Sequence, residues 1–172
     1  MDLGGTFMAE QVGYLKLRRV IECPDLDFVA GPISYWAQFR DMGGPGAFDY
    51  PTPATLRLHN KLWINEVDLR THLLDSNDHV SDVTTAHKTD EAIAREFALS
   101  LCSNAGLWLC NLAGGQRSWF DDIETGDTMG RLQKIADVAP AQDLRSTAEV
   151  AVVFSEQSMA YLRPLALQEP PG

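Results

Sequence analysis

Apolar residues along the chain form short continuous runs, separated by longer stretches in which they recur with helical spacing. Three runs, Leu26–Ile33, Lys61–Asn65 and Leu107–Leu112, predict strands. Runs that are apolar throughout are typical of strands buried on both faces, as in a parallel sheet. A fourth run, Ala148–Phe154, predicts one more strand beyond a break at Pro140.

Helical spacing predicts helices between these strands. The clearest is Asp90–Ser103, with Thr89 at its N-cap position. Its apolar stripe consists of Ile93, Phe97 and Leu101. Further helices are expected over Met8–Ile21 and Thr128–Val138, with a short helix or turn over Thr55–His59. The inward-facing residues expected in the last long helix are Met129, Leu132, Ile135 and Ala136.

Strands that alternate with helices predict an α/β fold built from βα units around a parallel sheet. We expect residues 1–139 to form this domain. Residues 140–172 are expected to add a linker, one strand, a short helix at Ser158–Leu162 and a disordered tail from Glu169. The Gly- and Pro-rich stretch Asp41–Pro53 is long for a simple connection, and long loops in compact domains are often functional.

Composition narrows the possible functions. The chain has 172 residues, 45% of them apolar and 22% charged, as is ordinary for a globular protein. The net charge of −10 makes nucleic acid and anionic membranes poor partners, because phosphate binding needs clustered Lys and Arg. The cysteines, Cys23, Cys102 and Cys110, include no close pair, which argues against disulfides and a zinc cage. Without a membrane-length apolar run or a signal-peptide pattern, a reducing cytoplasm is the expected compartment.

Candidate chemistry lies at the carboxyl ends of the strands, where βα folds gather their functional residues. Glu66 follows the second strand directly, with Asp68 and Arg70 just beyond it. Alternatively, these acids only suit the dipole of a helix N-terminus. The residues that follow the other two strands and could bind a ligand are Tyr35, Trp36, Asn111, Trp119 and Asp121. Aromatic rings stack on C–H faces while acids and amides bond hydroxyls, so this set is typical of a sugar site.

Two further tryptophans, Trp63 and Trp108, lie inside predicted strands and are expected to pack in the core. Other chemistries lack their motifs: the chain has no G-x-S-x-G, no phosphate loop, no H-E-x-x-H and no dinucleotide-binding fingerprint. The histidines have irregular spacing and no thiol partners, so we expect neither a metal nor a cofactor.

Four segments in a fixed order carry a family resemblance. They are GPISY with the Gly-rich loop after it, HNKLWINEVDLRTH (His59–His72), GLWLCNLAGG leading to WFDD, and AEVAVVFSEQSMAYL. Together they resemble the carboxyl-terminal half of β-galactosidases related to glycoside hydrolase family 42, over about Tyr14 to Leu162. The first three resemble the sixth, seventh and eighth barrel strands, and the last resembles the start of the trimerisation domain.

The resemblance implies a partial (half) β/α barrel of parallel strands, followed by the beginning of a flavodoxin-like region. It also implies hydrolysis of β-linked galactosides with retention. Glu66 takes the place of the nucleophile, with Asp68 and Arg70 as its supporting pair. Tyr35 and Trp119 would help to line the sugar pocket.

One departure from the family concerns the proton donor. The family's acid/base glutamate follows the fourth strand, and this sequence resembles the family only from about the fifth helix. Half a barrel exposes sheet edges, so we expect a homo-oligomer, with two halves facing each other. In such an assembly the acid could come from Glu124, Asp121 or a second copy of Glu66.

Two alternatives to a glycosidase stay open. One is a non-catalytic scaffold that oligomerises and binds carbohydrate through Trp36, Trp119 and Asp121. The other is a hydrolase of another bond, such as an ester, whose better leaving group needs less help from an acid.

Overall fold

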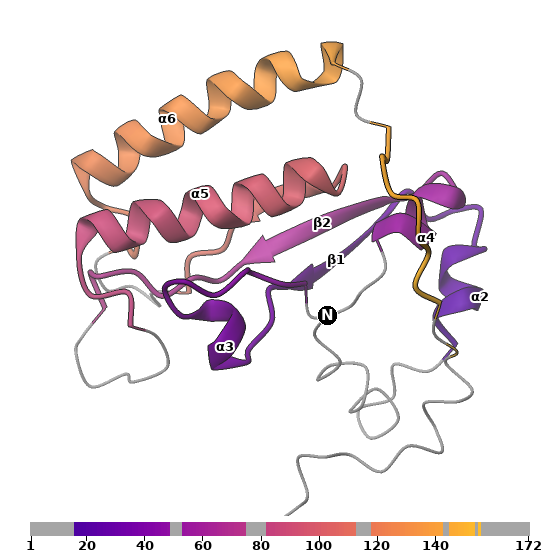
Figure 1. Ribbon diagram of the computed structural model, residues 1–172, viewed down its shortest axis with the longest axis horizontal. Helices are drawn as coiled ribbons and strands as arrows, with labels where there is room; N and C mark the ends of the chain where they lie inside the picture. Colours follow the sequence, from indigo (N-terminus) through magenta and orange to yellow (C-terminus); the bar gives the residue numbers. More distant parts are fainter. Residues whose placement is uncertain are drawn as a thin grey trace, which may run out of the picture.

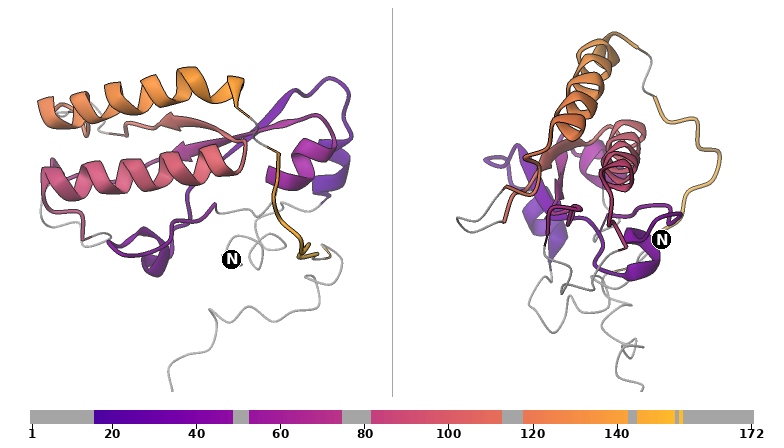
Figure 2. Two further views of the ribbon diagram at one scale, coloured as in Figure 1. Left: turned by 45° about the horizontal axis from the view of Figure 1, so that its top comes forward. Right: turned by 90° about the vertical axis from the view of Figure 1, so that its left-hand side faces the viewer.

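A computed structural model describes residues 16–48, 53–74, 82–112, 118–142, 145–153 and 155. Within these residues a three-stranded parallel sheet, in the order β1-β2-β3, carries two long helices side by side on one face (Figures 1 and 2). The strands are β1 (Phe28–Pro32), β2 (Leu62–Val67) and β3 (Gly106–Leu109). The helices are α2 (Leu17–Ile21), α3 (Ala37–Arg40), α4 (Pro53–Leu58), α5 (Ala86–Cys102) and α6 (Ile123–Val138), with a 3-10 turn at Ala139–Ala141.

The mixed α/β class, the parallel sheet and the three central strands are confirmed, with bounds shifted by a few residues. The predicted turn near Thr55 is the short helix α4, and the first predicted helix is present over Leu17–Ile21. The half barrel and the flavodoxin-like region stay predictions. The start of the first predicted helix, the helix expected at Ser158–Leu162 and the tail lie outside the described residues.

The core lies between the sheet and the helices. Alternate side chains of a strand point to opposite faces, and Trp63, Asn65 and Val67 of β2 are all buried on the helical side. One cluster packs around Val67 and Ile93; it also contains Ile33, Leu69, Val83 and Ala92. The second gathers Ile21, Phe48, Leu56 and Trp63 near the amino ends of the strands.

Trp63 is buried, as predicted, and it needs a glycine beside it. A Cβ atom added at Gly31 on the neighbouring strand would lie 2.5 Å from Cη2 of the Trp63 indole. Phe48 meets the same indole edge to face, with ring centroids 6.1 Å apart. The indole therefore occupies the space that a side chain on β1 would need.

Trp108 does not pack in the core, so this prediction was wrong. Its side chain is 44% exposed, because it points away from α5 and α6 toward the other face of the sheet. The apolar run through β3 suggested burial on both faces, whereas the described helices cover one. Trp108 and Glu66 are register partners on adjacent strands, and register partners share a face.

The predicted helix starts were too late. Helix α5 begins at Ala86, and its N-cap is Thr85, whose hydroxyl accepts a hydrogen bond from the Lys88 amide; Thr89 is buried inside the helix. Helix α6 begins at Ile123, where the Asp122 carboxylate caps the amides of Glu124 and Thr125. These first turns are polar, so hydrophobic spacing alone does not reveal them.

The inward faces of the two long helices also differ from prediction. Ile93 is buried against the sheet, but Phe97 and Leu101 are only partly buried and line a groove between α5 and α6. The other buried residues of α5 are Thr89, Ala92, Glu96 and Ser100. On α6, Met129, Leu132 and Ala136 are partly buried, whereas Ile135 is exposed.

The predicted fourth strand is absent from the described part of the run, Ala148–Val153. Val150, Val152 and Val153 are 80%, 70% and 87% exposed, and no strand pairs with them within the described ranges. A strand forms only where a neighbouring strand accepts its hydrogen bonds, which propensity alone does not supply. Phe154 lies outside the described residues.

None of the described helices is both long and apolar enough to cross a membrane. Over the same residues, His, Cys, Asp and Glu side chains form no cluster of three that could hold a metal ion.

We expect Leu56→Ala to lower the free energy of unfolding by about 2–5 kcal/mol, because it removes a fully buried side chain and leaves a cavity. Leu58 on the same helix is 84% exposed and is the matched control, since Leu58→Ala should change stability by at most about 0.5 kcal/mol. Urea denaturation of both variants measures the difference, and equal losses would contradict this packing of α4.

Candidate functional site

The carboxyl ends of the three strands meet at one edge of the sheet. Pro32 of β1 is in register with Glu66 of β2, which in turn is in register with Trp108 of β3. The segments that follow the three strands therefore begin close together at this edge. This edge is where parallel α/β sheets place their functional residues.

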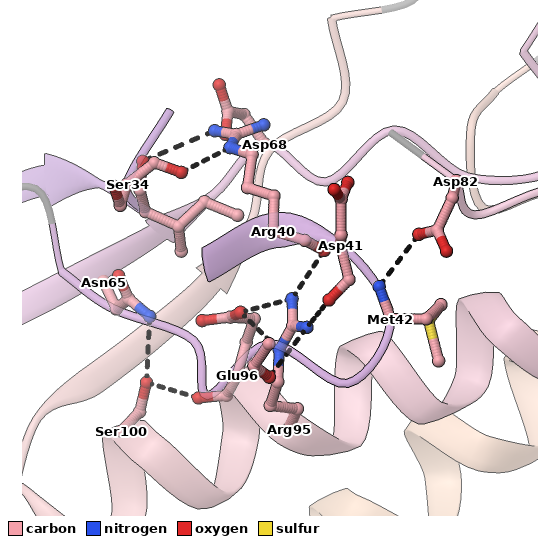
Figure 3. A network of polar contacts seen from close by, with 12 residues as sticks. Ser34, Arg40, Asp41, Met42, Asn65, Asp68, Asp82, Arg95, Glu96 and Ser100 are labelled. Carbon is pink, nitrogen blue, oxygen red and sulfur yellow. Dashed lines mark hydrogen bonds and ion pairs between the residues drawn. The ribbon is translucent and has the colours of Figure 1, made fainter. Parts of the chain in front are cut away.

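A buried ion pair organises this edge (Figure 3). The Arg40 guanidinium lies 2.5 Å from Oδ1 of Asp68, and both side chains are almost completely buried. Its Nε atom donates to the Ser34 carbonyl, so the end of α3 is tied to both β1 and β2. Buried charges require such pairing, because desolvation of an unpaired charge costs far more than one hydrogen bond.

Tyr35 completes the cluster around Asp68. Its hydroxyl donates to Oδ2 of Asp68 at 2.6 Å, and the Arg40 guanidinium lies 4.3 Å from the centre of its ring. Partial burial and the hydrogen bond to Asp68 raise the pKa of Tyr35 to about 12, so the phenol remains a neutral donor near pH 7. Both oxygens of Asp68 are thus engaged by protein groups.

Glu66 lies beside this cluster on the side of the sheet away from α5. Its side chain is partly buried, and its carboxylate is a charged neighbour of the Cys110 thiol. Burial and the neighbouring Glu66 carboxylate raise the pKa of Cys110. The thiol is therefore a protonated neighbour of Glu66 and not an activated nucleophile.

The Gly-rich loop after α3 is fastened to α5 by Arg95 (Figure 3). The Arg95 guanidinium donates to the carbonyls of Arg40, Asp41 and Gly44, and it pairs with the buried Glu96 carboxylate at 3.0 Å. Burial raises the pKa of Glu96 despite this pair. The backbone of the loop next to Arg40 is therefore held to α5 by hydrogen bonds.

The structure brings together some of the predicted site residues. Glu66, Asp68 and Tyr35 form one cluster, and Trp36, which follows Tyr35, is 42% exposed. Trp119 was expected to line the pocket, but its side chain is buried, and its carbonyl accepts a hydrogen bond from Thr71.

The remaining predicted residues lie around this cluster. Asn111 is exposed, and its side-chain amide donates to Ser118 and accepts from the Trp119 amide. Asp121 is exposed and precedes the N-cap of α6. Arg70 was expected to support Glu66 or Asp68; the ion-pair partner of Asp68 that the structure shows is Arg40.

Sequence reasoning missed Arg40, Cys110 and Trp108 as members of the site. Arg40 was hidden at the end of a four-residue helix, 28 positions from Asp68, and no local pattern links the two. Cys110 and Trp108 carried a usable signal, since both lie within two residues of the end of β3. Alternation along β3 would have placed both on the face of Glu66.

We expect Arg40→Met to lower the free energy of unfolding by about 3–5 kcal/mol, because it leaves the Asp68 carboxylate buried without its cation. Adding Asp68→Asn should recover part of this loss, since the amide carries no charge. Arg18→Met breaks an exposed pair with Glu22 and should leave stability unchanged in the same denaturation experiment. Equal effects of Arg40→Met and Arg18→Met would contradict the burial of the Arg40–Asp68 pair.

We expect Glu66→Gln to make Cys110 react several-fold faster with N-ethylmaleimide near pH 8. Loss of the carboxylate lowers the thiol pKa toward its usual value, so the thiolate fraction rises. The measurement uses a chain in which Cys23 and Cys102 are serine, and Glu91→Gln on the exposed side of α5 is the control. An unchanged rate would show that Glu66 does not perturb this thiol.

Comparisons with known proteins give no match. No protein-family model matches the chain, and neither a curated protein nor a solved structure is significantly similar to it. The resemblance to β-galactosidases of family 42 therefore remains a prediction that rests on the four sequence segments.

Proposed function

We propose that the carboxyl edge of the sheet is a carbohydrate site, and that the protein acts on β-linked sugars as a β-galactosidase-like glycoside hydrolase. The observation that carries the proposal is the position of Glu66. It lies next to the last residue of β2 with a partly buried side chain, in register with an exposed tryptophan and beside a cluster of fixed polar groups.

The two carboxylates of the edge differ in what they can do. Asp68 is held by Arg40 on one oxygen and by Tyr35 on the other, so it is a structural acceptor. Glu66 has the Cys110 thiol as a neighbour and is less buried than Asp68. A retaining glycosidase needs one carboxylate that can attack the anomeric carbon, and Glu66 suits that role.

Exposed aromatic rings supply the second requirement of a sugar site. Tyr35, Trp36 and Trp108 are 55%, 42% and 44% exposed, although large apolar side chains are more often buried. Tyr35 and Trp36 follow β1 and Trp108 lies near the end of β3, so the rings flank the end of β2 that carries Glu66. Aromatic faces of this kind stack on the C–H faces of pyranose rings while polar groups bond the hydroxyls.

The proton donor of the proposed reaction is a second carboxylic acid. A retaining mechanism places it roughly 5 to 5.5 Å from the nucleophile, and Asp68 is already committed to Arg40 and Tyr35. We assign the role to an acid brought by assembly with a second copy, with Asp121, Glu124 and the second Glu66 as candidates. Asp121 and Glu124 are both exposed near the start of α6.

A second candidate function is carbohydrate binding without turnover. The exposed rings of Trp36 and Trp108 favour it, because stacking on a sugar needs no nucleophile. In that case a galactoside should quench tryptophan fluorescence equally in the wild-type chain and in Glu66→Gln.

The test is hydrolysis of an aryl β-galactoside, whose leaving group departs with little help from an acid. We expect Glu66→Gln to lower turnover by about 100-fold or more, which corresponds to about 2.7 kcal/mol of transition-state stabilisation. Glu91→Gln removes an exposed carboxylate on α5 and should keep wild-type turnover. Loss of turnover in both variants, or in neither, would contradict the role of Glu66.

A further inference from the structure

The outer edge of β3 is open within the described part of the chain. The Cys110 amide donates to the Val67 carbonyl, so the even-numbered residues of β3 direct their backbone groups toward β2. By the alternation of a parallel ladder, Leu107 and Leu109 direct their N–H and C=O groups outward. Sheet order places no described strand beside them.

A groove lies between α5, α6 and β3. Its volume is about 600 Å³, and its walls come from β3, α5 and α6. The walls are largely apolar, with Phe97 and Leu101 from α5, Leu107 and Leu109 from β3, and Met129 and Leu132 from α6. Ala139 and Pro140, where the chain leaves α6, line one end of the groove.

The topology of the sheet indicates which kind of segment could pair with the outer edge of β3. The chain passes from β2 through α5 to β3, and α6 lies beside α5 on the same face (Figure 1). Helix α6 returns the chain from the carboxyl ends to the amino ends of the strands, as α5 does. A strand that follows α6 with the same right-handed crossover would run parallel to β3 along its free edge.

The segment that follows α6 has the composition of such a strand but lies elsewhere. Ala148–Val153 (AEVAVV) is rich in β-branched residues, and its valines are exposed. The chain carries it away from α6, toward the end of the molecule where α2 and α4 lie (Figure 1). An apolar strand-forming segment and an open apolar strand edge thus occur in one chain without meeting.

We propose that Ala148–Val153 of one copy adds to β3 of a second copy as a fourth parallel strand beneath α6. The donated segment supplies backbone partners for Leu107 and Leu109, and Val150 and Val152, which share one face of an extended strand, enter the groove. Domain swapping of this kind reuses the contacts that the segment would make in its own subunit, so it needs no new interface. If each copy donates to the other, the dimer is closed and the β3 edge of each copy is paired.

The connection before the segment, which includes the exposed Ser146 and Thr147, acts as the hinge. Extended chain spans at most about 3.5 Å per residue, so this connection can carry the segment beyond its own subunit. The exposed side chains of the three valines are free to make the new contacts. This inference rests on sheet topology and is independent of the proposed glycosidase activity.

Cross-linking between two kinds of full-length chain tests the exchange. Both carry serine at positions 23, 102 and 110. One is tagged and contains Leu107→Cys, and the other is untagged and contains Val152→Cys. After they are refolded together, a short bifunctional maleimide should join tagged to untagged chains, whereas Glu91→Cys in place of Leu107→Cys should give no product. No cross-link in the mixture would overturn the proposal.

A chain that contains both Leu107→Cys and Val152→Cys distinguishes strand exchange between copies from pairing of the segment with β3 of its own copy. If the segment pairs with β3 of its own copy, this chain cross-links internally at monomer mass, and the mixed sample gives no product. That result would also overturn the proposal. The aryl galactoside assay is a separate measurement, so failure of one proposal is distinguishable from failure of the other.

Light scattering of full-length variants is the second test of strand donation. The wild-type chain should be a dimer, and Val150→Asp with Val152→Asp should give a monomer with unchanged far-ultraviolet circular dichroism. Ser146→Asp with Thr147→Asp adds the same charge in the hinge and should leave the dimer intact. A monomeric wild-type chain, or dimers in all variants, would contradict strand donation.

Discussion

The carboxyl edge of the sheet depends on the contact between the Arg40 guanidinium and the Asp68 carboxylate. Strands β1 and β2 are held together by their ladder, but the segments beyond them have no ladder to continue. Arg40 reaches from α3 to the carbonyls of Ile33 and Ser34 and to Asp68, which fixes those segments relative to each other. Burial makes this contact costly to break, because either charge alone would be stranded in a region of low dielectric constant.

Arg95 has a related role behind the site. The backbone from Arg40 to Gly44 is irregular, and buried carbonyls without partners are strongly unfavourable. One guanidinium offers several donors in a fixed plane, so Arg95 can satisfy the carbonyls of Arg40, Asp41 and Gly44 together. The loop is thereby connected to α5 through the hydrogen bonds of Arg95.

How much the sequence predicts depends on the range of the interactions involved. Apolar runs located the three strands, because one face of the sheet packs against the long helices and is buried. The position of Glu66 followed from the same rule, since it directly succeeds the apolar run Lys61–Asn65 and lies near the end of β2. Arg40 could not be found this way, because its partner is remote in sequence. Trp108 and Ala148–Val153 were misjudged for a shared reason: strand propensity does not reveal which face or which edge is covered.

Gly31 and Trp63 share one volume across two strands. The indole fills the place where a side chain at position 31 would begin, so the two positions are constrained as a pair. A larger residue at 31 becomes acceptable only when 63 shrinks, and a smaller residue at 63 leaves a void unless 31 grows. In proteins that descend from a common ancestor with this one, substitutions at these positions should therefore arise together, and their covariation would record the contact between β1 and β2.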